Sequence, residues 1–284
     1  MHRFAVALLS FLVLMVPAHA TDHHEGDAHP RPYDRNFDAM PVVDEAMALA
    51  RNENKRLLLV LGANWCHDSR GLAHHFEDAD VAALLDAHYV TRHIDIGWRD
   101  RNQDIPRRFG VTAIYSTPTV FVIDPETGDL LNRGDWNRWG MAASASSEAV
   151  HDWLERWSQP RHDPADDLVV SSLIYQSMLV EIDIYEDEEG ERLAAAYRET
   201  GPWLDAEPED RPEDFDAMMR EISQWRRALP QTVTALREEA HARVMAALEE
   251  IAGDAPVTLD TVAILDARDP HISLTFEPHD SERW

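Results

Sequence analysis

The single cysteine of this 284-residue chain, Cys66, stands where an apolar run ends and a helix is predicted to begin. The first turn of a helix presents unpaired backbone amides and the positive end of the helix dipole, and both stabilise a thiolate. Cys66 is therefore the predicted nucleophile. His67 adds to this stabilisation when it is protonated, and the hydroxyl of Ser69 can donate a hydrogen bond to the sulfur. These three residues form the expected catalytic set.

A cysteine that stands alone restricts the chemistry to reactions between molecules. Ser69 occupies the position where a second cysteine could close a disulfide with Cys66, so the chain cannot form an internal one. A thiolate can attack the disulfide of another molecule and form a mixed disulfide, which an external thiol then releases. We expect a client protein thiol or disulfide, or glutathione, as the partner, and no cofactor.

The segments on both sides of Cys66 predict strands that alternate with helices. The continuous apolar run at residues 56–61 is typical of a buried strand, and a β-rich run entered through proline follows at residues 117–124. A turn after this second run favours a hairpin that returns through Leu130 and Leu131. The other expected elements are a strand at 89–96 and helices at 42–50, 67–76, 81–87, 105–109 and from Ser144 or Ser146 to 157.

Residues 40–158 resemble the thioredoxin family. The resemblance is carried by the strand Leu57–Leu61, by Trp65-Cys66-His67-Asp68-Ser69 at the start of a helix, and by Thr117-Pro118-Thr119 at the start of the next strand. It implies an α/β sandwich in which helices flank a central mixed sheet. It also implies a thiol at the exposed N-terminus of a helix, with a cis-proline facing it.

The resemblance further implies a substrate-binding set of Trp65, Thr117 and Pro118. Pro118 is the candidate cis-proline, and the backbone before it is expected to pair with a bound substrate chain. The family's buried acid, six residues before the first cysteine, is replaced here by Val60. The acid assists the resolving cysteine, so both parts of a dithiol cycle are missing together.

A polar segment with two prolines, residues 159–164, separates this domain from a mainly helical region at residues 165–284. Two apolar stripes meet at Pro230 and predict a pair of helices joined there as a hairpin. Residues 180–184 and 272–276 alternate like strands and predict a small sheet beside the helices. The apolar stripes form either a core or a surface for a partner.

The first twenty residues have the pattern of a secretory signal peptide. Arg3 precedes an apolar stretch at residues 4–16 that is too short to span a bilayer, and Ala18-His19-Ala20 is a small-residue cleavage signal. We expect export, with the periplasm as the compartment, and no stable membrane insertion after cleavage. Residues 21–39 are expected to form a flexible, histidine-containing lead.

Cleavage after Ala20 would create a metal motif at the new amino terminus. Thr21, Asp22 and His23 would then offer a free amine and an imidazole at position three, the nitrogen ligands of a square-planar copper(II) or nickel(II) site. Metal handling by this segment is therefore one alternative function.

The composition excludes some partners and leaves one more function open. With 53 acidic against 26 basic residues and a formal charge of -27, the chain lacks the clustered cations that nucleic acids and anionic lipids require. The second alternative is a binding module without catalysis, which would use the thioredoxin-like groove or the C-terminal helices. The sequence leaves the client, the recycling reductant and the oligomeric state open.

Overall fold

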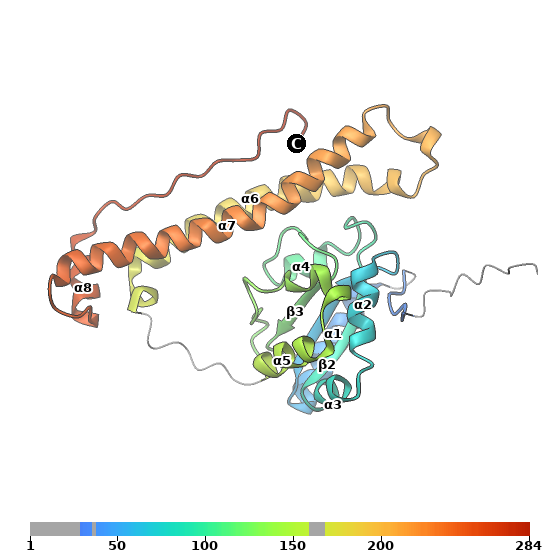
Figure 1. The fold of residues 1–284 in the computed structure, drawn as a ribbon, viewed down its shortest axis with the longest axis horizontal. Helices are drawn as coiled ribbons and strands as arrows, with labels where there is room; N and C mark the ends of the chain where they lie inside the picture. Colours follow the sequence, from blue (N-terminus) through green and yellow to red (C-terminus); the bar gives the residue numbers. More distant parts are fainter. Residues whose placement is uncertain (1–28, 36–37, 159–167) are drawn as a thin grey trace, which may run out of the picture.

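The computed structural model describes residues 29–35, 38–158 and 168–284, and it places an α/β sandwich before a long helical hairpin (Figure 1). The sandwich contains α1 (Ala39–Glu53), β1 (Arg56–Gly62), α2 (His67–His75), α3 (Ala79–His88), β2 (Tyr89–Asp95), α4 (Asp104–Arg108), β3 (Thr119–Ile123), the 3-10 helix η1 (Arg138–Ser144) and α5 (Ser147–Ser158). The helical region contains η2 (Leu168–Ser171), α6 (Leu173–Leu204), η3 (Pro208–Asp210), α7 (Phe215–Ala252) and α8 (Leu259–Arg268).

The sheet is mixed, as expected, with the strand order β2-β1-β3 in the described residues. β1 lies in the centre, parallel to β2 and antiparallel to β3. The predicted hairpin after β3 is reduced to a single antiparallel bridge. Leu130 makes only an isolated bridge to Ile123, because the chain turns away after that single pair.

Alternate residues of β1 face two different helical layers. Leu57, Leu59 and Leu61 are fully buried in the cluster that includes the apolar face of α1. Leu58 and Val60 point into the other cluster, which contains side chains of α2, α3 and α5. A strand covered on both faces reads as a continuous apolar run, which is why the sequence located β1 correctly.

The helical hairpin differs from the predicted one. Helix α7 continues through Pro230, so the predicted break there is wrong, and its partner is α6. Leu229 and Val233, on either side of the proline, are both buried in the same core, so the packing face of α7 is uninterrupted. Packing along α6 offsets the backbone hydrogen bond that a proline removes.

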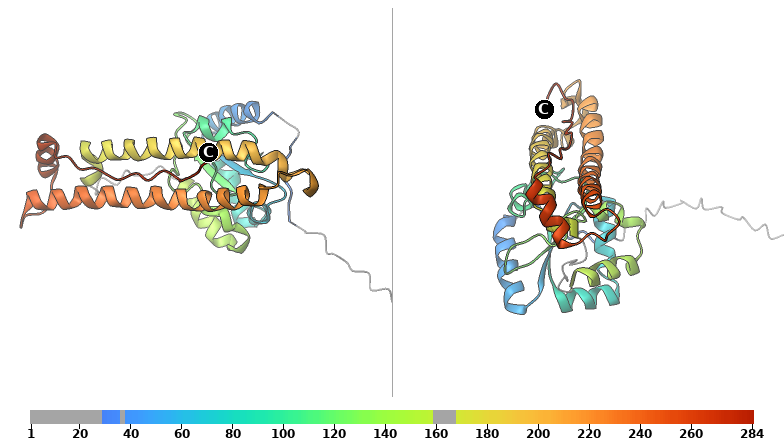
Figure 2. Two further views of the ribbon diagram at one scale, coloured as in Figure 1. Left: turned by 90° about the horizontal axis from the view of Figure 1, so that it is seen from above. Right: turned by 90° about the vertical axis from the view of Figure 1, so that its left-hand side faces the viewer.

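The small sheet predicted for the C-terminal region is also wrong for the described residues. Residues 180–184 belong to α6, where Ile182 is buried while Val180 and Ile184 are exposed. Residues 272–276 are extended but pair with no strand. Figure 2 shows the chain after α8 running along α6 and α7, where Arg243 donates a hydrogen bond to the Ser273 carbonyl oxygen and Tyr185 to that of Glu277.

One end of the hairpin lies over the loops at one end of the sheet, and the end that carries α8 extends beyond the sandwich (Figure 1). Side chains of both parts share one buried apolar cluster. No helix in the described ranges combines the length and the hydropathy that a membrane span requires.

Candidate functional site: the Cys66 thiol and the loops around it

Cys66 is the N-cap residue of α2, and its backbone is extended rather than helical. The turn before it is closed by a hydrogen bond from the Cys66 amide to the Ala63 carbonyl oxygen at 3.1 Å. The thiol donates to the carbonyl oxygen of Thr117 at 3.0 Å. The peptide bond between Thr117 and Pro118 is cis. The sequence-predicted cysteine, threonine and proline therefore meet at one place.

The thiol is less accessible than the resemblance implied. Cys66 is only 8% exposed and Thr117 only 4%, and Pro118 is buried as well. The expectation of an exposed thiol is wrong, because the cysteine side chain points toward the Thr117 loop instead of toward solvent.

Ser69 lies on the first turn of α2, but its hydroxyl is used elsewhere. It accepts a hydrogen bond from the Ala63 amide at 3.4 Å, and the residue is fully buried. The expected hydrogen bond from Ser69 to the sulfur is not among the contacts of the described residues. Ser69 therefore braces the turn that carries Cys66.

The lead before α1 is not wholly flexible, which corrects that prediction for residues 29–35. Tyr33 is 2% exposed, and its backbone exchanges two hydrogen bonds with the Asn64 side chain. Gly62 makes room for this ring, since a Cβ there would lie 2.5 Å from the Tyr33 hydroxyl oxygen. Burial raises the pKa of Tyr33, and its hydroxyl lies within electrostatic range of Cys66 and Asp95.

Asp95 is a buried carboxyl that sequence reasoning missed. It ends β2, it is 2% exposed, and one of its oxygens accepts a hydrogen bond from the Gly97 amide at 2.9 Å. Burial raises the pKa of Asp95, although that hydrogen bond and the nearby Arg35 partly oppose the shift. Val60 does replace the family's acid in sequence, and Asp95 brings a different carboxyl to this end of the sheet.

Trp65 stands at the exposed edge of the site, with 39% of its surface accessible. It stacks on Trp98 with 4.2 Å between ring centroids, and its Nε1 donates to the Gly97 carbonyl oxygen at 2.9 Å. The Arg99 guanidinium lies 5.6 Å from the centroid of the Trp65 ring. The loop after β2 thus supplies two site residues, Trp98 and Arg99, that no sequence pattern marked.

His67 is exposed on α2, and its ring lies 6.0 Å from that of His29. The next residue, Asp68, accepts a hydrogen bond from the Ala143 amide at 3.1 Å, which ties α2 to η1. His75 contacts the Ser147 hydroxyl, at the start of α5, and the Ala142 carbonyl oxygen, in η1. It therefore also links α2 to η1.

The helical hairpin holds the loop that leads to Pro118. The Tyr197 hydroxyl, on α6, donates to the Ile114 carbonyl oxygen at 2.8 Å. Arg226, on α7, donates to the neighbouring Tyr115 carbonyl oxygen at 2.6 Å. The hairpin therefore engages two consecutive carbonyl groups of this loop.

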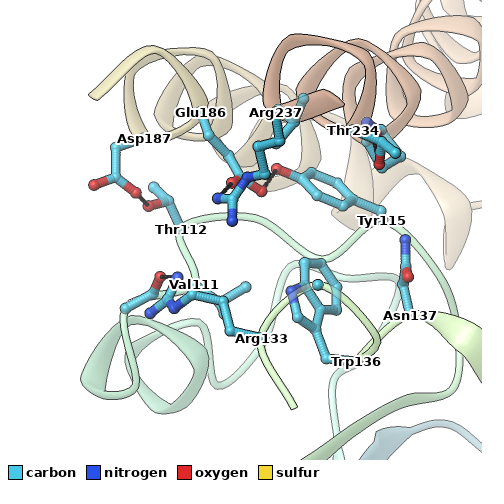
Figure 3. A pocket seen from close by; sticks show the side chains of 14 residues that line it. Val111, Thr112, Tyr115, Arg133, Trp136, Asn137, Glu186, Asp187, Thr234 and Arg237 are labelled. Carbon is cyan, nitrogen blue, oxygen red and sulfur yellow. Dashed lines mark hydrogen bonds and ion pairs between the residues drawn. The ribbon is translucent and has the colours of Figure 1, made fainter. Parts of the chain in front are cut away.

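A second contact between the α/β sandwich and the helical hairpin surrounds a cavity of about 80 Å³ (Figure 3). There the Tyr115 hydroxyl donates to Glu186 at 3.0 Å, and Arg237 lies 3.4 Å from the same carboxylate. Thr112 donates to Asp187 at 2.6 Å. Burial raises the pKa of Glu186, and the hydrogen bond from Tyr115 and the charge of Arg237 partly oppose it.

A metal site in the described residues would need a group of possible ligand side chains that lie close together. The predicted copper or nickel ligands, Thr21, Asp22 and His23, and the predicted signal peptide lie outside the described residues. Within those residues, one group of three side chains comes within 4.8 Å of one another, namely His151, Asp152 and Glu155 on α5. Two of them are exposed acids, a common arrangement on a protein surface.

Comparison with known proteins agrees with the site's position in the fold. Residues 38–125 match the model of a thioredoxin-like family. This part of the chain is thioredoxin-like. A solved structure, the disulphide isomerase from Xylella fastidiosa Temecula1, is 29% identical, with 46% of this chain and 98% of that chain covered and a TM-score of 0.43. No curated protein compared with the chain matches it significantly.

Proposed function

We propose that the protein is exported and performs thiol–disulfide exchange through intermolecular mixed disulfides at Cys66. The observation that supports this most strongly is the position of the sole cysteine at the N-cap of α2, with its sulfur 3.0 Å from the Thr117 carbonyl oxygen beside Pro118. Thiolates at helix starts are nucleophilic. The thioredoxin-like family match covers both the cysteine and the proline.

The exchange conserves atoms and electrons without a cofactor. Cys66 loses its proton to solvent, and its thiolate attacks one sulfur of a client disulfide. A new bond forms between Cys66 and that sulfur, and the other client sulfur leaves as a thiolate that takes up a proton. Because Ser69 cannot attack the mixed disulfide, release requires a second, external thiol.

The test is to identify what is attached to Cys66 in the cell. The full chain would be expressed in a bacterial host, quenched in acid, alkylated and analysed by intact mass without reductant. We expect processing after Ala20 and a reducible adduct that is absent from Cys66→Ala. The matched variant Ser69→Ala leaves the nucleophile in place and should retain the adduct.

A binding module without catalysis would give a different result. Partners would then remain bound in the presence of reductant and with Cys66→Ala, and no adduct would be found on the folded parent. That outcome would overturn the proposal. A mature amino terminus that does not follow Ala20, or retention of the protein in the cytoplasm, would overturn the export part alone.

A further inference from the structure

Two arginines near the Thr117 loop have no acidic partner among the described residues. Several arginines of the described residues, such as Arg35, Arg107 and Arg283, form ion pairs with carboxylates. Arg99 and Arg226 form no ion pair with any residue that the structure describes. Two neighbouring guanidinium groups without a counter-charge are unfavourable unless an anion joins them.

The two arginines come from different parts of the fold and meet at one loop system. Arg226 reaches from α7 to the Tyr115 carbonyl oxygen, two residues before Thr117, which holds the thiol. Arg99 has a left-handed backbone, with φ of 78°, and its guanidinium lies beside Trp65, the neighbour of Cys66. The fold therefore brings Arg99 beside the neighbour of Cys66, and Arg226 to the loop that leads to Thr117.

The charges of Arg226, on α7, and of Cys66 both act on Arg99. Burial and the charge of Arg226 lower the pKa of Arg99 to about 10, while Tyr197 and Cys66 act in the opposite direction. Arg99 is thus within electrostatic range of all three groups. A thiolate at Cys66 or a ligand anion would relieve the repulsion between the two arginines.

Two buried polar atoms in the loops around Cys66, one on Thr117 and one on Arg99, also lack a partner in the described residues. The Thr117 side chain is buried, and its Oγ1 accepts and donates no hydrogen bond within the described residues. The Nε of Arg99 is in the same condition. Unpaired buried donors are costly, and an oxyanion supplies the acceptor that both of them lack.

The size of the substrate is limited by what covers the loop. Thr117 and Pro118 are buried, and the carbonyl groups before them are occupied by Tyr197 and Arg226. An extended protein chain would have to displace the groups that bury Thr117 and Pro118 before it could lie along them. A small molecule needs only to pass Trp65, which is the exposed side of the site.

We infer that Cys66 exchanges with a low-molecular-weight disulfide that carries a carboxylate, and that Arg99, Arg226 and the Thr117 hydroxyl bind that carboxylate. This inference rests on the proposed function and names its substrate class. The thiolate of Cys66 takes one half of the disulfide, the other half leaves as a thiolate that takes up a proton, and a second molecule of the small thiol regenerates Cys66.

The test compares three small disulfides of different charge. Reduced full-length protein is treated with glutathione disulfide, with neutral bis(2-hydroxyethyl) disulfide and with cationic cystamine, and the rate of adduct formation is measured by intact mass. Each rate is divided by that of the same chain unfolded in urea, which removes the intrinsic reactivity of each disulfide. A net charge of -27 would by itself favour cystamine.

We expect the folded protein to prefer glutathione disulfide over cystamine by roughly tenfold at low salt, with the preference falling as salt screens the arginines. Arg99→Met and Arg226→Met should each reduce the preference severalfold, and Arg99→Lys should retain part of it. Arg101→Met and Arg227→Met are matched controls on the same loop and helix, and they should leave it unchanged. Melting temperatures would establish that each variant is folded.

The outcomes separate this inference from the proposed function. If all three disulfides react but cystamine is preferred, or if the arginine variants keep the parent's preference, the carboxylate subsite is overturned while exchange at Cys66 stands. If a disulfide-bonded protein reacts faster than glutathione disulfide, the small-substrate inference is overturned in favour of a protein client. If no disulfide reacts with the folded protein, the proposed function itself is overturned.

Discussion

The sulfur of Cys66 and the carbonyl oxygen of Thr117 lie 3.0 Å apart, so the thiol is hydrogen-bonded to the loop that the helical hairpin holds. The hairpin occupies the two carbonyl groups at Ile114 and Tyr115, just upstream. The C-terminal helices and the Cys66 sulfur therefore contact the same loop. A change at the hairpin contact should consequently alter the reactivity of Cys66.

Gly201→Ala should expose the thiol. A Cβ at Gly201, on α6, would lie 2.6 Å from the Cβ of Asp100, in the loop that carries Trp98 and Arg99. The loop or the helix must shift, and we expect alkylation of Cys66 by iodoacetamide to accelerate severalfold. Alanine in a helix normally stabilises by about 1 kcal/mol relative to glycine. A variant that melts higher and reacts at the parent rate would contradict this contact.

Ser69→Cys should create a pair that can close a disulfide. Residues three apart on the first turn of a helix lie on one face, at a spacing that a disulfide can bridge. The variant loses the hydrogen bond that Ser69 accepts from Ala63, so a modest loss of stability is expected. Oxidation should lower the intact mass by two hydrogens and block alkylation of both sulfurs. If both thiols of the variant stay reduced in excess oxidant, the side chains at positions 66 and 69 point apart and the prediction is wrong.

His93 should make the fold sensitive to acid. Its ring lies 5.4 Å from that of Tyr33, its Nε2 is buried without a partner in the described residues, and burial lowers its pKa from 6.5 to about 4. The unfolded chain therefore takes up this proton first as the pH falls. The stability that His93 contributes is present above pH 6.5 and is lost toward pH 4, by on the order of 3 kcal/mol.

His93→Phe removes that titration. Chemical unfolding of the parent and the variant at several pH values should show the parent losing stability relative to the variant between pH 6.5 and 4. A constant difference across that range would mean that His93 titrates normally in the folded protein.

The contribution of Glu186 to folding stability should depend on pH in the opposite direction to that of His93. Burial raises its pKa above the ordinary value of 4.5, so the folded state favours the protonated carboxyl. The stability it contributes is present below pH 4.5 and is lost as the pH rises through the raised pKa. Glu186→Gln keeps an acceptor for the Tyr115 hydroxyl, and it should gain in melting temperature relative to the parent as the pH rises from 4.5 toward neutrality. A gain that instead appears on acidification would reverse the sign of this argument.

Local patterns determined the elements around the site. The apolar run at β1 and the helical spacing of α1 and α5 reflect which side chains each element buries, and that information lies within a few neighbouring residues. The position of Cys66 at a helix start followed from the same patterns. The predicted hairpin at Pro230 failed because a single proline was weighed without the long partner helix α6, whose packing keeps α7 continuous.

Tertiary structure alone decided how the site is closed and which charges surround it. Tyr197 and Arg226 bind backbone carbonyl groups 83 and 111 residues away, and every residue has a carbonyl group, so such contacts leave no signature in the sequence. Arg99 likewise resembles any loop arginine until the fold places it beside Trp65. The sequence thus determined the position of Cys66 at a helix start and the sheet beneath it, because both depend on short-range patterns. The burial of Cys66 and the positions of Arg99 and Arg226 depend on contacts between residues far apart in the chain, which only the folded structure brings together.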